Sequence, residues 1–253
     1  MDLRVIAVNK LQIQGTQRAF LDSYELLNRS LAVYPDSAEL WALQAKLETF
    51  YLLQWNLAAH SVEQSLTRKD TANARIFRGW LAATPGQLNQ PTKKIARARR
   101  VSPSTSTSAL TRSEEDLQTA QGLAPTDFWP HFEMAAWLNH IAARYADSRK
   151  QYEIVEAKAA DNAFLQFFFG LLLKHHSEER ARGQALMTKA MAQASSLPGQ
   201  AAGNLAFQAQ LLATRGRDVE AAECCEFSKQ ILDLSVTSAS VICSLIQQRV
   251  LVV

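Results

Sequence analysis

Glycine and proline are both scarce in this chain, which has 9 glycines and 7 prolines in 253 residues. Typical proteins contain about 7% glycine and about 5% proline, and an all-β protein with many tight turns would need more of both. Cysteine is scarcer still, and 3 residues, of which Cys224 and Cys225 are adjacent, cannot build a disulfide framework. We therefore expect long helices and reduced, buried thiols. Such thiols suit the cytoplasm, with the nucleus as the alternative compartment.

Long apolar runs are also lacking. The strongest run extends from Ala163 to Leu173 and contains one glutamine and one glycine. It is too short to span a bilayer and suits a buried helix. The first ten residues carry an early Asp2 and no long apolar stretch, so they do not predict a signal peptide. We expect no membrane contact. The apolar fraction of 47% and the charged fraction of 20% are those of a packed protein.

The positive charge is concentrated in one segment. Residues 85–112 hold six basic residues and no acidic one, so subtracting them from the net charge of +3 leaves −3 for the rest of the chain. The segment is also rich in serine and threonine and contains three prolines. Such a sequence buries too little apolar surface to offset its ordering entropy. We predict a flexible basic insertion at 85–112.

A small side chain followed by a large apolar one recurs along the chain. In Ser23, Leu27, Ser30 and Pro35 the spacings are 4, 3 and 5 residues. The first small residues of the six occurrences are Ser23, Ala58, Ser113, Ser148, Gly183 and Ala221, at intervals of 35, 55, 35, 35 and 38 residues. Small residues on one helical face let a second helix approach closely. Apolar segments with helical periodicity precede these occurrences, so the pattern predicts stacked helix pairs.

This pattern resembles the tetratricopeptide repeat family, whose 34-residue helix–turn–helix unit carries W-x2-L-G-x2-Y, then A-x3-F, then a late proline. Trp41 and Ala45 match the tryptophan and glycine positions of the first helix, with Gln44 where leucine is expected, and Gly170 matches the glycine position. The resemblance covers roughly residues 3–233. It implies an all-α solenoid of about six TPR-like helix pairs plus a C-terminal helix.

The interval of 55 residues between Ala58 and Ser113 is longer than the usual 35, which indicates an insertion. This insertion separates two groups of helices. Residues 1–84 then hold two helix pairs and the first helix of the third, and residues 113–234 hold the remaining TPR-like helices. Residues 235–253 form a terminal capping helix or a truncated repeat, and they end on four bare apolar residues.

No sequence pattern supports catalysis or a cofactor. There is no glycine-rich phosphate loop, no nucleophile elbow and no H-E-x-x-H zinc motif. The five histidines are scattered, and Cys224 and Cys225 have no suitably spaced co-ligands. We expect a non-catalytic protein with no metal and no cofactor.

The resemblance assigns outward positions of the first helices to a concave groove. These positions are Lys46, Asn73, Trp80, Glu133, Trp137, His140, Phe167 and Lys174, together with Glu39, Phe164 and Gln210. Aromatic residues mixed with single charges suit an extended partner peptide or a helix with aromatic anchors. A register error of one residue would instead place half of these side chains in the core.

The basic run in the insertion admits three interpretations. Its charged residues are Lys93, Lys94, Arg97, Arg99 and Arg100. It is a solvated loop, a nuclear-import or nucleic-acid patch, or a regulated segment in which Ser102, after two arginines and before Pro103, is a phosphorylation site. A phosphate would cancel about a third of the local charge. Nucleic acid is disfavoured, because no aromatic side chain lies within the run for base stacking.

The function predicted from these features is recognition of a partner protein, as an adaptor, assembly factor or co-chaperone-like scaffold. A nucleic-acid-associated or nuclear protein that uses residues 93–100 is one alternative. A regulatory segment of a larger enzyme is another, since the stretch from Asp127 to Phe132 looks like repeat arrays appended to some bacterial serine/threonine kinases.

Overall fold

The structure, a computed structural model, describes residues 3–14, 17–50, 54–83, 107–174 and 176–231. Within these ranges the chain is helical and contains no strand. The helices are α1 (Leu3–Gln14), α2 (Gln17–Val33), α3 (Ala38–Phe50), α4 (Trp55–Arg68), α5 (Ala72–Ala83), α7 (Thr107–Leu123), α8 (Trp129–His140), α9 (Tyr145–Ala159), α10 (Ala163–Leu173), α11 (Arg180–Ala192), the single 3-10 turn η1 (Ala194–Ser196), α12 (Gln200–Thr214) and α13 (Asp218–Ile231).

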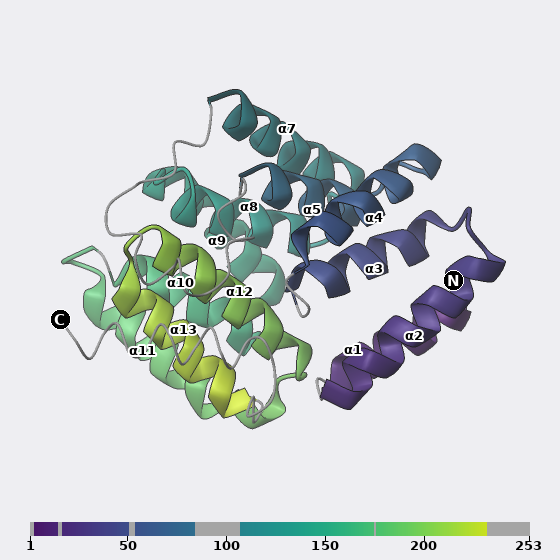
Figure 1. The fold of residues 1–253 in the computed structure, drawn as a ribbon. Coiled ribbons are helices and arrows are strands. Elements are labelled where there is room, and N and C mark those ends of the chain that lie inside the picture. Colours follow the sequence, from purple (N-terminus) through teal and green to yellow (C-terminus); the bar gives the residue numbers. More distant parts are fainter. Residues whose placement is uncertain (1–2, 15–16, 51–53, 84–106, 175, 232–253) are drawn as a thin grey trace.

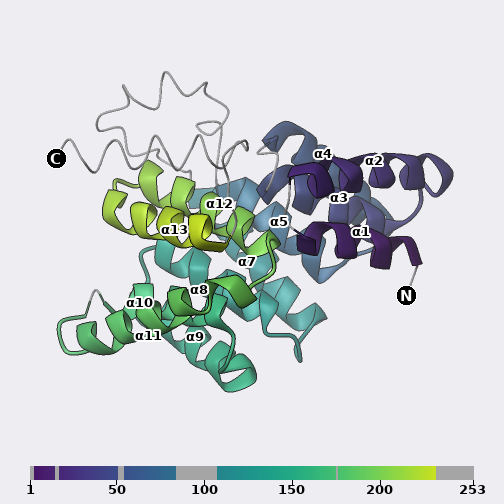
Figure 2. The ribbon, with the colours of Figure 1, turned by 90° about the horizontal axis from the view of Figure 1, so that it is seen from below.

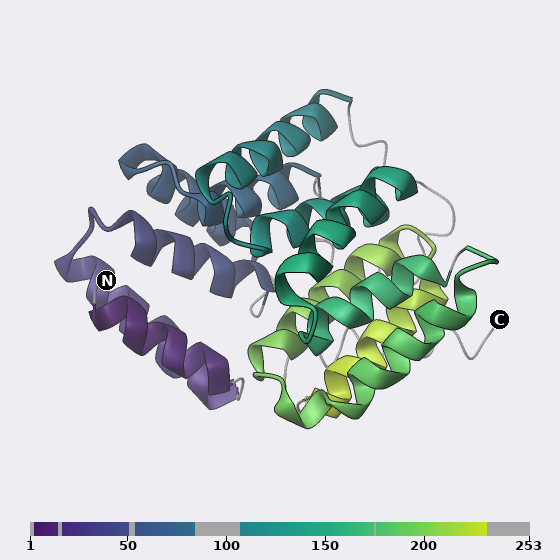
Figure 3. The ribbon, with the colours of Figure 1, turned by 180° about the vertical axis from the view of Figure 1, so that it is seen from behind.

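Consecutive helices pack as six pairs, α1/α2, α3/α4, α5/α7, α8/α9, α10/α11 and α12/α13. The pairs follow one another along an arc, from the purple N-terminal pair to the yellow C-terminal pair (Figure 1). The arc curls back, so that α12 contacts both α1 and α3. Figures 2 and 3 show the last pair beside the N-terminal pairs from two further directions. The predicted all-α solenoid of about six helix pairs is confirmed for the described residues.

The recurrent small residues lie where the two helices of a pair touch. Ser113 of α7 donates its hydroxyl to the carbonyl of Gly79 in α5 at 2.6 Å, and Ser148 of α9 donates to the carbonyl of Ala135 in α8 at 2.8 Å. The last pair repeats the contact further along its second helix, where Ser228 donates to the carbonyl of Ala202 at 2.8 Å. Only a small side chain allows one backbone to come this close to the next, which explains the interval of about 35 residues.

The pair α10/α11 takes this close approach furthest. A Cβ atom on Gly170 would lie 2.6 Å from the carbonyl oxygen of Gly183, and one on Gly183 would lie 2.6 Å from the backbone nitrogen of Lys174. Real Cβ atoms do not come this near to backbone atoms, so both positions require glycine. Glycine costs about 1 kcal/mol in a helix interior, and this close packing is the physical reason for its presence at Gly170.

The turn between α12 and α13 follows the sequence signals for the end of one helix and the start of the next. Gly216 has a positive φ of 73°. Its amide donates to the carbonyl of Ala213 at 3.2 Å, and the amide of Arg217 donates to that of Leu212 at 3.0 Å. These bonds satisfy carbonyls at the end of α12, and α13 then begins at Asp218.

Buried apolar side chains form two clusters. One cluster joins α8 to α13 and contains Phe168, Leu205 and Leu212, among others. The other joins the N-terminal pairs to α8 and contains Trp80, and Phe207 and Leu211 of α12 belong to it. Thus α12 contributes side chains to both halves of the array, although it is far in sequence from the N-terminal half.

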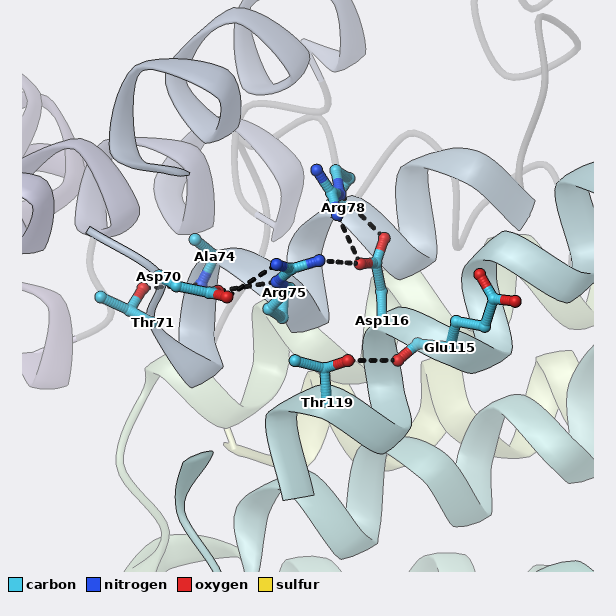
Figure 4. Close-up of polar contacts among 8 residues, drawn as sticks. All are labelled: Asp70, Thr71, Ala74, Arg75, Arg78, Glu115, Asp116 and Thr119. Atoms are coloured by element: carbon cyan, nitrogen blue, oxygen red, sulfur yellow. Dashed lines mark hydrogen bonds and ion pairs between the residues drawn. The ribbon is translucent and has the colours of Figure 1, made fainter. Parts of the chain in front are cut away.

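A charged network joins α5 to α7 in the third pair (Figure 4). The Asp116 carboxylate is 3% exposed and accepts hydrogen bonds from Arg75 at 2.9 Å and from Arg78 at 2.7 and 2.8 Å. Arg75 also bonds both oxygens of Asp70, at 2.6 and 2.7 Å. Charge-assisted bonds of this kind are stronger than neutral ones. The network therefore fixes the helix that follows the insertion against the helix that precedes it.

Replacing Asp116 with asparagine is expected to lower the free energy of unfolding by about 1–2 kcal/mol, because the guanidinium groups lose their shared negative partner. Asp70 is the matched control, since its carboxylate also bonds Arg75 but is 43% exposed. Asp70→Asn should cost about 0.5 kcal/mol or less. Urea unfolding followed by circular dichroism measures both, and equal costs would contradict the assigned role of Asp116.

Two predicted segments fall largely outside the described residues. The basic residues Lys93, Lys94, Arg97, Arg99 and Arg100 and the candidate site Ser102 lie in the undescribed range 84–106, and the predicted terminal helix lies in 232–253. Helix α7 begins at Thr107, so residues 107–112, which the sequence assigned to the insertion, are helical. The helix can begin this early because no proline lies between Pro103 and the start of the repeat. Partial burial of Ala109 and Leu110 stabilises this first part of α7.

Candidate partner-binding cavity

A hollow lies between the first helices of the pairs. Its volume is about 460 Å³. It is lined by Val5, Asn9, Glu39, Ala42, Leu43, Lys46, Thr71, Asn73, Phe77, Asp127, Phe128, Trp129, Asn162, Phe164, Leu197, Pro198, Ala201 and Asn204. These residues belong to the first helix of each of the six pairs or lie just before it, and none lies on a second helix. The cavity is therefore built by the curvature of the whole array.

Helix N-termini surround the cavity. Thr71 accepts a hydrogen bond from the amide of Ala74 at 3.2 Å, Asp127 accepts one from the amide of Trp129 at 3.0 Å, and Asn162 accepts one from the amide of Leu165 at 3.3 Å. Their side chains satisfy amides that a helix leaves open in its first turn. These three side-chain hydrogen bonds thus hold the first turns of α5, α8 and α10 around the opening.

An aromatic wall forms one side of the cavity. The rings of Trp129 and Phe164 are stacked, with centroids 6.2 Å apart, and Phe128 meets Trp129 edge-on at 6.3 Å. Phe132 lies behind them, 5.2 Å from Trp129 and 5.3 Å from Phe164. Because rings from two neighbouring pairs support one another, the wall is rigid and offers an apolar surface to a bound side chain.

A buried carboxyl lies beneath the cavity. Glu133 of α8 is fully buried, and its Oε2 accepts a hydrogen bond from the indole of Trp80 at 2.7 Å. Burial raises the pKa of Glu133 from 4.5 to about 8, although Trp80, Asn204 and the positive charge of Lys46 counteract it. Burial likewise lowers the pKa of Lys46 to about 8, which the charge of Glu133 opposes. The two groups therefore share one poorly solvated polar site that reaches the cavity through Lys46.

The groove residues expected from the sequence divide into two sets. Lys46 and Asn73 line the cavity, as do Glu39 and Phe164. Trp80, Glu133, Trp137, His140 and Phe167 are at most 3% exposed. Lys174 is partly buried and forms an ion pair with Glu223 of α13. The structure therefore brings only part of the predicted set to an open surface.

Helix α12 covers part of the other set. Its Phe207 meets Trp80 with ring centroids 5.5 Å apart, and its Gln208 bonds His140 at 2.8 Å. In the repeat register these side chains point to the inner side of the arc. Because the array curls, α12 of the last pair lies against them. Sequence reasoning missed Asn9, Phe128, Trp129 and Asn204 as lining residues. Phe128 and Trp129 follow Asp127, whose side chain accepts a hydrogen bond from the amide of Trp129 at the start of α8.

Comparison with solved structures identifies proteins that share this helical architecture. A tetratricopeptide repeat protein from Parabacteroides merdae superposes with a TM-score of 0.50 and 13% sequence identity, over 96% of this chain and 84% of that one. The chain has a tetratricopeptide-repeat fold. The C-terminal part of a TPR repeat-containing protein from Cytophaga hutchinsonii matches with a TM-score of 0.44 and 11% identity, over 90% of this chain and 78% of that one. Yeast Tom70 matches with a TM-score of 0.37 and 14% identity, over 92% of this chain and 52% of that one.

The sequence itself matches no family model and no curated protein. The repeat motif is weak in this TPR-fold chain, which explains why its sequence matches no family model. In the repeat that carries Trp41, for example, Gln44 stands at the leucine position. The full consensus is absent, whereas small residues are present at the pair contacts.

His131 of α8 and the two cysteines of α13 contact other parts of the fold. Within the described ranges, no group of three or more His, Cys, Asp or Glu side chains is placed to hold a metal ion. Cys224 and Cys225 are buried in α13, as predicted. His131 shares hydrogen bonds with Gln121 and Gln151 at 3.1 and 2.9 Å. Over the same ranges, every helix is too short or too polar to span a bilayer.

Proposed function

We propose that this chain is a non-catalytic protein-interaction scaffold, acting as an adaptor or assembly factor, that holds an extended segment of a partner protein in the cavity of the first helices. The observation that carries the proposal is the lining of that cavity, to which all six helix pairs contribute. Its volume of about 460 Å³ is within the range of pockets that enclose a few side chains. A surface shared by every pair is what a stacked helical array offers to an extended ligand.

The polar groups of the cavity suit a peptide backbone. Asn9, Asn73 and Asn204 lie on three different first helices. Each amide side chain can both donate and accept hydrogen bonds, as a peptide group requires. The aromatic wall of Phe128, Trp129 and Phe164 gives a partner side chain an apolar anchor. Together they favour a partner segment with regularly placed apolar residues.

Substituting Asn73 with arginine is expected to weaken partner capture at least tenfold, because Asn73 is exposed and lines the cavity, so that the longer side chain enters the binding space. Asn56→Arg is the matched control, since Asn56 is exposed on the second helix α4 and lies outside the cavity. The measurement is quantitative affinity capture from cells that produce the protein, with wild type and both variants compared at equal helicity. Retention of the same partners by Asn73→Arg would refute the cavity as the binding site.

A further inference from the structure

Helix α12 lies on the concave surface as a bound helix would. Phe207 fits between two tryptophans, with ring centroids 5.5 Å from Trp55 and 5.5 Å from Trp80. Gln208, the next residue, bonds Nδ1 of His140 at 2.8 Å. Every residue from 201 to 213 is buried. We name this contact the closing seam: Asn204, Phe207 and Gln208 of α12 against Trp55, Trp80, Glu133 and His140.

The closing seam covers side chains that the repeat register assigns to partner recognition. Trp80, Glu133 and His140 come from α5 and α8, the first helices of the third and fourth pairs. In a stacked array the concave faces of such helices bind ligands. Here the ligand position is taken by a helix of the same chain, so α12 itself shows which kind of helix the surface accepts.

The polar groups around the closing seam are incompletely satisfied. Four buried side-chain atoms of seam residues have no hydrogen-bond partner among the described residues: Trp55 Nε1, Glu133 Oε1, Asn204 Oδ1 and Gln208 Nε2. Each buried group without a partner reduces the stability of the contact. A different helix that satisfies some of these groups would bind the same surface more strongly than α12 does.

The contact of α12 with its own partner helix is of another kind. The interface with α13 includes the bond from Ser228 to the carbonyl of Ala202, and Ala221, Cys224 and Phe227 of α13 belong to the same buried apolar cluster as Leu205 and Leu212 of α12. In α13 one buried side-chain atom, Asp218 Oδ1, lacks a hydrogen-bond partner among the described residues. The contact with α13 therefore leaves fewer polar groups unsatisfied than the closing seam does, and the closing seam is the weaker of the two faces of α12.

We propose that the surface beneath α12 is a helix-binding site, where a partner helix takes the place of α12. This partner helix carries an aromatic anchor, with one amide side chain three residues before the anchor and another one residue after it. This inference rests on the proposed function as a protein-interaction scaffold. The spacing is that of Asn204, Phe207 and Gln208, which share one helical face. The aromatic ring occupies the position between Trp55 and Trp80, and the amides meet Glu133 and His140.

Arg217 links the turn of the last pair to the end of α8. Its guanidinium donates to the backbone oxygen and the side-chain oxygen of Asn139, at 3.0 and 3.2 Å. Opening the seam requires these bonds to break. The apparent affinity of an incoming helix is reduced in proportion to the fraction of molecules in which the seam is open, so weakening the attachment of α12 raises that affinity.

The test measures binding of a fluorescein-labelled synthetic peptide, with the sequence of residues 198–217, to the full-length protein by fluorescence anisotropy. In wild type the linked α12 competes with the peptide. Phe207→Ala removes the anchor from the linked helix only, and we expect it to bind the peptide at least tenfold more tightly than wild type does. Arg217→Gln should strengthen binding about threefold or more, because it removes the link to α8. Arg182→Gln, at a half-exposed ion pair with Glu156, should match wild type.

A second peptide in which alanine replaces the residue equivalent to Phe207 identifies the binding mode. It should bind the Phe207→Ala protein at least tenfold more weakly than the first peptide does. If Phe207→Ala is not folded by circular dichroism, Arg217→Gln decides the outcome. The proposal is overturned if the folded variants bind the peptide no better than wild type, or if the two peptides bind alike. Neither result affects the Asn73→Arg experiment, which tests the open cavity and not the closing seam.

Discussion

Replacing Gly170 with alanine is expected to lower the free energy of unfolding by about 2 kcal/mol or more. The added Cβ would lie 2.6 Å from the Gly183 carbonyl oxygen and 2.8 Å from Cγ of Met187. The Met187 side chain can move aside, but the Gly183 carbonyl belongs to the backbone of α11, so the two helices must separate. This cost exceeds the gain of about 1 kcal/mol in helix propensity. Urea unfolding followed by circular dichroism measures the change.

Gly122 is the matched control for Gly170. It lies in α7, and a Cβ there would have no neighbouring atom within 4 Å. Gly122→Ala should therefore raise the free energy of unfolding, by up to about 1 kcal/mol, because alanine is the better helix former. If the two substitutions change stability in the same direction, the close approach of α10 and α11 does not restrict residue size at Gly170.

The stability of the wild-type protein is expected to fall as the pH rises from 4.5 to 8, because Glu133 has a pKa of 4.5 when unfolded and about 8 in the folded chain. Between these values the folded protein holds a proton on Glu133 that the unfolded chain has released, so the unfolded state binds fewer protons and stability declines with rising pH. A difference of one pH unit between the folded and unfolded pKa values corresponds to about 1.4 kcal/mol, so we expect Glu133 to account for a decline of about 2 kcal/mol or more.

Glu133→Gln isolates this contribution, since glutamine has the same shape and does not titrate. The free energy of unfolding, measured by urea titration at a series of pH values, should decline less for the variant than for wild type across this window. Lys46 affects stability in the opposite direction and at higher pH. Burial lowers its pKa from 10.5 to about 8, so its titration raises the free energy of unfolding only as the pH rises above about 8. Parallel curves for wild type and Glu133→Gln would show that Glu133 is not buried as a neutral acid.

The helix pairs could be predicted because their contacts depend on residue size. Ser113, Ser148 and Gly183 are small for the same reason, which is that a neighbouring backbone passes within hydrogen-bond or van der Waals distance. This constraint is local to one pair and recurs in each, so it leaves a period in the sequence. The start of α7 was harder to predict from the sequence, because residues 107–112 carry no strong helix signal. They join the helix through partial burial of Ala109 and Leu110.

The candidate site was only partly predictable. Lys46 and Asn73 were identified as groove residues and line the cavity, whereas Trp137 and Phe167, predicted in the same way, are buried. Repeat register gives the direction in which a side chain leaves its helix. It contains no information on whether a distant part of the chain covers that side chain, as Gln208 covers His140.

Composition and periodicity alone determined that the chain is helical and that its helices pair, because both depend on residues within one helix or one pair of consecutive helices. The tertiary structure decided how far the array curls, and with it which concave residues remain open. That curvature is the sum of small rotations between successive pairs, and it brings Phe207 of the last pair between Trp55 and Trp80 of the second and third. Such a sum depends on all the pair contacts at once, so no single segment of the sequence records it.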